Sequence, residues 1–364
     1  MIMISHCLLH DNDNYYNIFL VMFFLVWLEN MKNFGKTTKT TKISGRILGW
    51  SSFVLFLSLI YGCERSQVNL PTEKSTSTVS SPATQTKIVA TFLPVYLFTK
   101  AIVGDVAKVD VLVKPGTDIH EYQSTPDNVK AIATADVLVK SGLGLEEFLE
   151  GTVKNAKNPK LVEIDASKGI RVMDDGSPVE KIKGEKHDHK HDHAQGNPHV
   201  WLDPVLAKQQ VINIRDGLIA ADGQNKQTYE TNAATYIQEL DNLNREFQQT
   251  LDKRPNCTFI TFHDAFPYMA KRYNLKQVAV VELPEDKLAP GDIQAVINTV
   301  RKYKVKVLFS EPGIDNKLLT SLAQDLNLTL YSLNSLETGE RNPQYYFQAM
   351  RDNLKSLATG CQKQ

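Results

Sequence analysis

The sequence lacks excess charge, paired cysteines and repeated long apolar runs. Its 364 residues carry 41 Lys+Arg and 41 Asp+Glu, a balance that argues against a strongly basic nucleic-acid binder. No apolar run of about 18 residues recurs, which excludes a polytopic membrane protein. Four cysteines in 364 residues exclude a small disulfide scaffold, and the absence of a Cys-x-x-Cys pair argues against a thiolate zinc finger. With 42% hydrophobic and 23% charged residues, the composition is that of a folded globular chain.

The start of the chain has the order of an export signal. A basic region that follows Met31 precedes an apolar stretch, Ile47–Tyr61, of signal-peptide length. The stretch ends in Gly-Cys63, which resembles a bacterial lipoprotein cleavage site and implies a lipid on the Cys63 sulfur. We therefore interpret residues 1–62 as a removed signal peptide with its true start at Met31. A real N-terminal extension and an uncleaved anchor are the alternatives.

The rest of the chain alternates short apolar runs with helical patterns. Residues 63–86, rich in Ser, Thr and Pro, are typical of a flexible linker. From Lys87 onward the alternation favours an α/β fold of two lobes, each with a mainly parallel four-stranded sheet flanked by helices. The predicted strands are Lys87–Phe92, Lys108–Val113, Ala135–Lys140, Leu161–Asp165, Thr258–Phe262, Gln277–Val281, Val305–Phe309 and Thr329–Ser332.

One long helix is predicted between the two groups of strands. Apolar residues recur every three or four positions over 225–253, so they share one helical face. We interpret this segment as a rigid connection between an N-terminal lobe, 87–224, and a C-terminal lobe, 254–364. A surface helix inside one domain is the alternative. Shorter helices are predicted at Thr125–Ala135, Ala265–Tyr273, Gly291–Tyr303 and Asp315–Leu326.

Histidines are concentrated at a few places. Of the nine, four alternate with other residues in a charged segment, 174–197, which lacks periodicity and is predicted to be a mobile insertion. His120, His199 and His263 instead lie in predicted loops, two of them after strands, where open α/β sheets bind ligands. Neutral imidazole suits zinc, copper, nickel or iron, so these three are candidate metal ligands. The histidines of the insertion are His187, His189, His191 and His193.

Four motifs carry a family resemblance. They are PGTDIHEYQSTP, NPHVWLDP, the Tyr229-x-x-Asn232 start of the long helix, and FHDAFPYMAKRYNL. Their order and spacing resemble the metal-specific substrate-binding proteins of ABC transporters, in the zinc and manganese cluster, from about Lys87 to about Leu357. The resemblance implies two α/β lobes joined by one long helix, with the metal in the cleft between them.

The resemblance also implies the ligands. His120, His199 and His263 match the family's metal-binding positions, and histidine at the third position is typical of zinc binders. The fourth ligand departs from the family pattern, because Asn334 stands where many members have Asp. We therefore expect water as the fourth ligand, with Glu311 and Asn334 as weaker candidates.

These features predict a zinc receptor rather than an enzyme. The protein is expected to be exported, anchored in a membrane through Cys63 and monomeric, and to pass zinc to the permease and ATPase of an ABC importer. The His-rich insertion, similar to that of zinc-specific members, would add weak zinc sites. A manganese receptor and a metal-buffering or adhesion lipoprotein remain alternatives. A zinc hydrolase is disfavoured because the sequence has no His-Glu-x-x-His motif.

Two further expectations concern single side chains. Cys257 and Cys361 are candidates for a disulfide, since export exposes thiols to an oxidising compartment, and an ordinary buried thiol is the alternative for Cys257. Asp203 precedes Pro204, an arrangement that favours the Asp side chain as the cap of a helix beginning there.

Overall fold

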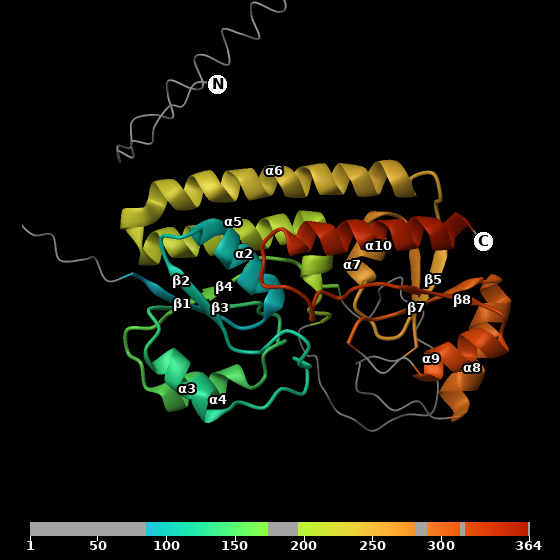
Figure 1. Ribbon diagram of the computed structural model, residues 1–364, viewed down its shortest axis with the longest axis horizontal. Helices are drawn as coiled ribbons and strands as arrows, with labels where there is room; N and C mark the ends of the chain where they lie inside the picture. Colours follow the sequence, from blue (N-terminus) through green and yellow to red (C-terminus); the bar gives the residue numbers. More distant parts are fainter. Residues whose placement is uncertain (1–84, 174–195, 281–289, 314–316, 363–364) are drawn as a thin grey trace, which may run out of the picture. The chain divides into compact units, whose positions relative to one another are not determined.

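Two parallel sheets form the framework of the protein. The computed structural model describes residues 85–173, 196–280, 290–313 and 317–362. Its strands pair in the orders β2-β1-β3-β4 and β6-β5-β7-β8, so both sheets have the same topology (Figure 1). The prediction of two four-stranded parallel sheets is confirmed. The strands are β1 (Lys87–Ala90), β2 (Lys108–Val111), β3 (Val137–Lys140), β4 (Val162–Asp165), β5 (Thr258–Thr261), β6 (Lys276–Ala279), β7 (Val307–Ser310) and β8 (Thr329–Ser332).

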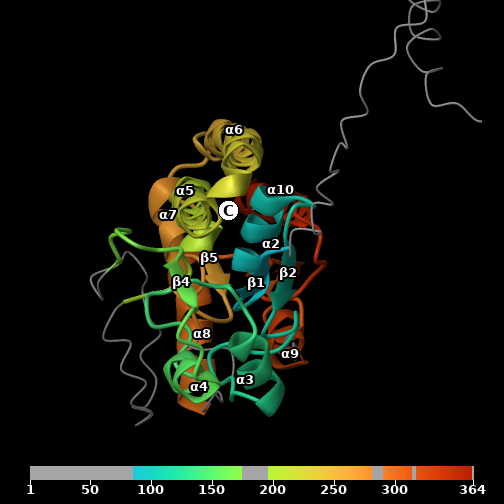
Figure 2. The same cartoon turned by 90° about the vertical axis from the view of Figure 1, so that its left-hand side faces the viewer.

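The first sheet is covered by helices on both faces. Helices α2 (Leu93–Val103) and α5 (Pro204–Ala221) pack against its strands. Helices α3 (Pro126–Ala133) and α4 (Leu149–Ala156) pack against each other and lie on the side away from α5 (Figures 1 and 2). Both faces are therefore buried, which is why β3 has the continuous apolar run Val-Leu-Val rather than an alternating pattern.

The second sheet has two separate apolar faces. Ile260, Val278 and Leu308 belong to a cluster with residues of α8 (Pro290–Tyr303) and α9 (Lys317–Asp325). Their strand neighbours Phe259 and Phe309 point the other way, into the larger core that includes α10 (Tyr345–Gln362). Successive strand side chains alternate between faces, so burial of both faces requires apolar residues on each face.

Helix α6 (Lys226–Leu251) runs alongside both halves of the structure. It packs against α2 and α5 of the first half and against α10 of the second (Figures 1 and 2). At about 1.5 Å per residue, its 26 residues extend for about 39 Å. The helix predicted over 225–253 is confirmed, and its seven apolar residues at three- or four-residue spacing are all buried, from Tyr229 to Leu251.

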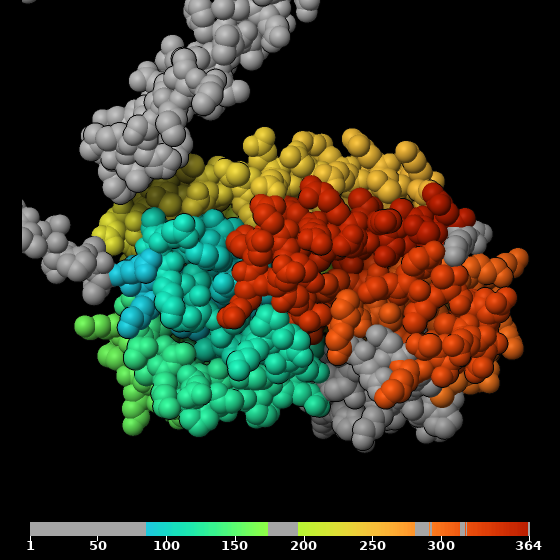
Figure 3. All heavy atoms as spheres, in the orientation of Figure 1, coloured from blue at the N-terminus to red at the C-terminus, as the bar shows by residue number. Residues whose placement is uncertain are grey.

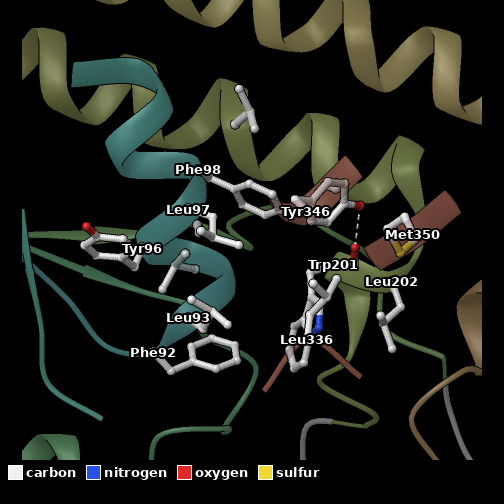
Figure 4. Packing of buried hydrophobic residues seen from close by; sticks show 14 of the residues in the cluster. Phe92, Leu93, Tyr96, Leu97, Phe98, Trp201, Leu202, Leu336, Tyr346 and Met350 are labelled. Carbon is white, nitrogen blue, oxygen red and sulfur yellow. Dashed lines mark hydrogen bonds between the residues drawn. The ribbon is translucent and has the colours of Figure 1, made fainter. Parts of the chain in front are cut away.

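The two halves share one hydrophobic core. Phe92 of the first half packs edge-on against Trp201, with ring centroids 4.9 Å apart, and Leu336 of the second half lies beside them (Figure 4). The Trp201 indole N–H donates to the Ser335 carbonyl at 2.7 Å, and the Tyr346 hydroxyl donates to the Trp201 carbonyl at 2.8 Å. In the space-filling view the C-terminal residues lie directly against those of the first half (Figure 3).

Several sequence-based predictions concern single residues or segments. Cys257 and Cys361 form a disulfide, with their Cα atoms 5.7 Å apart, which ties the start of β5 to the end of α10. Within the described ranges, each helix is too short or too polar to cross a bilayer. The signal peptide, Cys63 and the insertion histidines lie outside the described residues.

Candidate metal centre

Four potential metal ligands converge at one point. His120, His199, His263 and Glu337 each offer one donor atom, and these atoms all lie within 4.8 Å of one another. The structure thus brings together the three histidines selected from the sequence. It adds the carboxylate of Glu337, which no sequence motif indicated.

The two parallel sheets explain this convergence. His120 lies in the loop after β2, His263 follows β5, and Glu337 follows β8, so each of these three lies beyond the carboxyl end of a strand. His199 is the N-cap residue of a short 3-10 helix, η1 (Val200–Leu202), which precedes α5. The site therefore draws donors from both halves of the chain.

The spacing of the donors suits a small tetrahedral cation. The Nε2 atoms of His199 and His263 are 3.4 Å apart, and Glu337 Oε1 lies 3.7 Å from His199 Nε2. The same oxygen lies 3.8 Å from His120 Nε2 and 4.0 Å from His263 Nε2. A tetrahedron with bonds of about 2.0–2.1 Å has edges of about 3.3–3.4 Å, so a zinc site needs these donor atoms, which lie within 4.8 Å of one another, to move closer together.

A carboxylate supports His263 from behind. The Nδ1 atom of His263 lies 2.5 Å from Glu311 Oε1, and both side chains are almost fully buried. Burial acts to lower the pKa of His263, but the charge and hydrogen bond of Glu311 outweigh it and raise the pKa to about 9. Because Nδ1 faces Glu311, Nε2 is the atom presented to the other donors.

An amide occupies the corresponding position behind His199. The Nδ1 atom of His199 lies 3.0 Å from Asn197 Oδ1, and Nε2 faces the donor cluster. Burial lowers the pKa of His199 to about 3, assisted by the neighbouring imidazoles of His120 and His263. This imidazole is therefore neutral near pH 7, the form that binds a metal ion.

His120 has neither kind of support. Its side chain is 2% exposed, yet its two ring nitrogens have no hydrogen-bond partner among the described residues. The loop itself is held through the backbone: Gly116 N–H donates to the Glu337 carbonyl at 3.0 Å, and His120 N–H donates to Asp118 Oδ1 at 2.8 Å. Burial of ring nitrogens without a hydrogen bond is costly, and binding of a metal ion would satisfy one of them.

A tight turn aims Glu337 into the cluster. Leu336 has a φ of 67°, in the left-handed region, and its N–H donates to Asn334 Oδ1 at 2.7 Å. A bulky residue rarely adopts this conformation, and such residues gather at functional sites. Burial acts to raise the pKa of Glu337, but the imidazoles of His120 and His199 hold it well below its usual range. The carboxylate is thus ionised beside three imidazoles.

The structure corrects the expectations for the fourth donor. Asn334 shapes the turn, and its Nδ2 donates to the Tyr345 hydroxyl at 2.8 Å, so its amide lies outside the donor cluster. Glu311 lies behind His263 instead of beside the other donors. A protein carboxylate, Glu337, occupies the position for which water was expected. The only sequence signal for Glu337 as a ligand was its position three residues after Asn334, which stands at the fourth-ligand position of the family.

The expected cap at Asp203 is confirmed. Its side chain accepts from Val205 N–H at 2.9 Å at the start of α5. The same carboxylate also accepts from Arg272 Nε of helix α7 (Pro267–Arg272). Asp203, close to His199 in sequence, is therefore bound to α7, which begins shortly after His263.

Comparison with known proteins identifies the family. A family model described as zinc-uptake complex component A, periplasmic (ZnuA), matches residues 88–360. The chain belongs to this family. His120, His199, His263 and Glu337 could supply the four ligands of a tetrahedral zinc site.

Individual relatives agree with this assignment. The high-affinity zinc uptake system protein ZnuA of Bacillus subtilis is 34% identical over 275 residues, which are 74% of this chain and 86% of the relative. The zinc-binding lipoprotein AdcA of Streptococcus pneumoniae is 33% identical over 277 residues, and the match spans 74% of this chain and 54% of that protein. The crystal structure of the Zn(II)-bound ZnuA-like domain of that AdcA has a TM-score of 0.64 at 31% identity, covering 76% of this chain and 99% of that domain.

Proposed function

We propose that this protein captures Zn²⁺ through His120, His199, His263 and Glu337 and delivers it to the permease of an ABC importer. The observation that carries the proposal is the four-donor cluster, whose atoms lie within 4.8 Å of one another. The chain that carries this cluster belongs to a family whose description is zinc-uptake complex component A, periplasmic. No covalent step is required, because the cation is cargo rather than a cofactor.

The donor set favours zinc over manganese. Three imidazole nitrogens suit Zn²⁺, whereas Mn²⁺ prefers carboxylate, carbonyl and water oxygens and more ligands. Glu337 supplies one negative charge, so a Zn²⁺ ion with Glu337 and three neutral imidazoles would have a net charge of +1, leaving out Glu311. The buried Glu311 carboxylate behind His263 offsets that remaining charge.

The location of the protein forms part of the same proposal. Cleavage before Cys63 would leave a lipid-anchored chain outside the cytoplasm, with 63–86 as a linker, lobes at 87–224 and 254–364, and the helix over 225–253 between them. The permease and its ATPase are the proposed partners, and the protein acts as a monomer. The name zinc-binding lipoprotein, carried by one relative, supports the anchor.

The His-rich segment has a separate role in this proposal. His187, His189, His191 and His193 would bind zinc weakly and increase its local concentration, because neutral imidazoles near pH 7 are good zinc ligands. Deletion of residues 187–193 should therefore leave one tight site. Loss of all tight binding on that deletion would contradict the assignment of the four-donor cluster.

Metal competition tests the main proposal. Zn²⁺ and Mn²⁺ would be titrated by calorimetry into protein that starts at Glu64 and lacks residues 187–193, with and without His263→Ala. One tight zinc site, weak manganese binding and loss of the tight site on substitution are expected. Lys208→Met, which removes a surface ion pair with Asp241, is the matched control and should keep the site. Tight manganese binding would make the protein a manganese receptor.

Cell fractionation tests the location. Cys63→Ser removes the sulfur that would carry the lipid, so the protein should move from the membrane to the soluble exported fraction. Retention of the variant in the membrane would instead favour an uncleaved anchor.

A further inference from the structure

Asn197 lies between the segments that carry two of the donors. Its side-chain oxygen lies 3.0 Å from the backbone nitrogen of His199 and 3.0 Å from the Nδ1 atom of the same residue. Its side-chain nitrogen donates to the carbonyl of Asp264, next to His263, at 2.6 Å. One amide group thus contacts one candidate ligand directly and the neighbour of another.

The two backbone contacts fix which way the amide points. The His199 N–H can only donate, so the atom that faces it must be the amide oxygen. The Asp264 carbonyl can only accept, so the atom that faces it must be the amide nitrogen. Exchange of the two atoms would break both hydrogen bonds.

This orientation determines the tautomer of His199. Because an acceptor oxygen faces Nδ1, the proton of the neutral imidazole must lie on Nδ1. The lone pair is then on Nε2, which lies 3.4 Å from His263 Nε2 and 3.7 Å from Glu337 Oε1. The amide therefore presents the metal-binding atom of His199 to the other donors before any cation arrives.

The same residue helps to hold the two ligand segments together. The Asn197 carbonyl accepts from the Tyr268 hydroxyl of α7 at 2.6 Å, in addition to the contact with Asp264. Asp203 and Arg272 form a third connection between these segments. Although His199 precedes the long helix in the chain, its segment is thus joined to the segment that carries His263.

We propose that Asn197 is a positioning residue of the zinc site, which fixes the tautomer of His199 and holds the His199 segment against the His263 segment. The proposal rests on the function proposed above. Partners behind metal ligands typically affect metal affinity by about 10–100-fold. Asn197 combines this role with a connection between segments that are far apart in sequence.

Three variants separate the two roles. Asn197→Leu removes both, so zinc affinity should fall by about 10–100-fold. Asn197→Asp keeps an acceptor for His199 but places an oxygen against the Asp264 carbonyl, so it should lose less affinity than the Leu variant. Tyr268→Phe removes the hydrogen bond to the Asn197 carbonyl, together with one from Met173 N–H, and leaves the Asn197 side chain in place. Asn213→Leu is the matched control, since Asn213 also bridges backbone carbonyls, those of Ala166 and Lys168, away from the site.

Nitrogen NMR of the His199 ring in the purified, metal-free protein supplies a readout that a purely structural role would not move. The wild-type protein and the Asp and Phe variants should show the proton on Nδ1, and the Leu variant should show a mixture of tautomers. The absorption spectrum of the first equivalent of bound Co²⁺ should change in the Leu variant, be restored in part by Asp, and stay unchanged in the control.

Specific results would overturn the proposal. An unchanged tautomer in Asn197→Leu would do so, as would zinc affinity within twofold of wild type. If the Leu variant does not fold, Asn197→Asp decides: wild-type zinc affinity and an unchanged Co²⁺ spectrum would contradict the positioning role. Because the NMR measurement needs no metal, it remains informative even if wild-type protein binds no zinc, which would refute the proposed function instead.

Discussion

His263 and His120 are opposite extremes within one donor cluster. His263 is fully buried, and a buried carboxylate holds its Nδ1 atom at 2.5 Å. His120 is nearly as buried, but its ring nitrogens have no hydrogen-bond partner within the described part of the chain. The same residue type thus has a hydrogen-bonded carboxylate behind its ring on one side of the site and none behind it on the other, so we expect the donors to differ in how firmly each would hold a cation.

The difference follows from where each loop is anchored. His263 comes directly after a central strand of the second sheet, and Glu311 follows the strand beside it, so the backbone places imidazole and carboxylate side by side. His120 lies further from its strand, β2, at the edge of the first sheet. Adjacent strands thus place a carboxylate behind His263, whereas the loop after the edge strand β2 places no hydrogen-bonding side chain behind His120.

The largest expected effect comes from removal of the two histidines in turn. His263→Ala should lower zinc affinity by more than about 100-fold, because it removes a ligand together with the hydrogen bond to Glu311. His120→Ala should cost less, because no carboxylate is hydrogen-bonded behind that ring and a water molecule can take its place. Competition titration with a zinc chelator measures both. An equal loss of zinc affinity in the two variants would contradict the expected difference between His263 and His120.

The pH dependence of zinc binding should reflect His263. With a pKa of about 9, this residue is protonated at pH 7 in the metal-free protein and must release its proton to bind zinc. Affinity should therefore rise by about tenfold per pH unit between about pH 7 and 9 and then level off. His199, with a pKa of about 3, adds nothing in this range. Calorimetry in buffers of different ionisation enthalpy should detect about one released proton per zinc at pH 7.

Glu311→Gln should sharpen the comparison by making His263 resemble His199. The amide keeps an acceptor near Nδ1 but removes the charge that raises the pKa of His263. Zinc affinity at pH 9 should fall by about tenfold, and the rise between pH 7 and 9 should flatten. Chelator competition at several pH values tests this. A pH profile that stays as steep as that of the wild type would show that Glu311 is not the cause.

The smallest effect is expected at the junction of the two halves. Tyr346→Phe removes the hydrogen bond to the Trp201 carbonyl, so the free energy of unfolding should decrease by about 0.5–1.5 kcal/mol. Zinc affinity should change by less than threefold, roughly, since no donor is touched. Urea unfolding of the metal-free protein, followed by tryptophan fluorescence, measures the first quantity. A large loss of zinc affinity would mean that this junction supports the site directly.

The prediction of the fold succeeded because the elements are locally encoded. Apolar runs such as Thr258–Thr261 and the long periodic face of α6 indicate strand and helix without knowledge of their neighbours. Strand ends shifted by one or two residues, as at β1, which ends at Ala90 instead of Phe92. The pairing order itself, identical in the two sheets, depends on contacts that no local pattern specifies.

The donor cluster contains residues that the sequence predicted and one that only the tertiary structure identified. The sequence determined the three histidines, since they alone among the nine stand in loops of the folded lobes within recognisable motifs. It did not identify Glu337, because the left-handed turn at Leu336 redirects the chain there and gives Asn334 a place in the turn. The carboxylate behind His263 was also decided by tertiary structure, because Glu311 is distant in sequence and follows a neighbouring strand, whereas the amide behind His199 comes from Asn197 in the same segment.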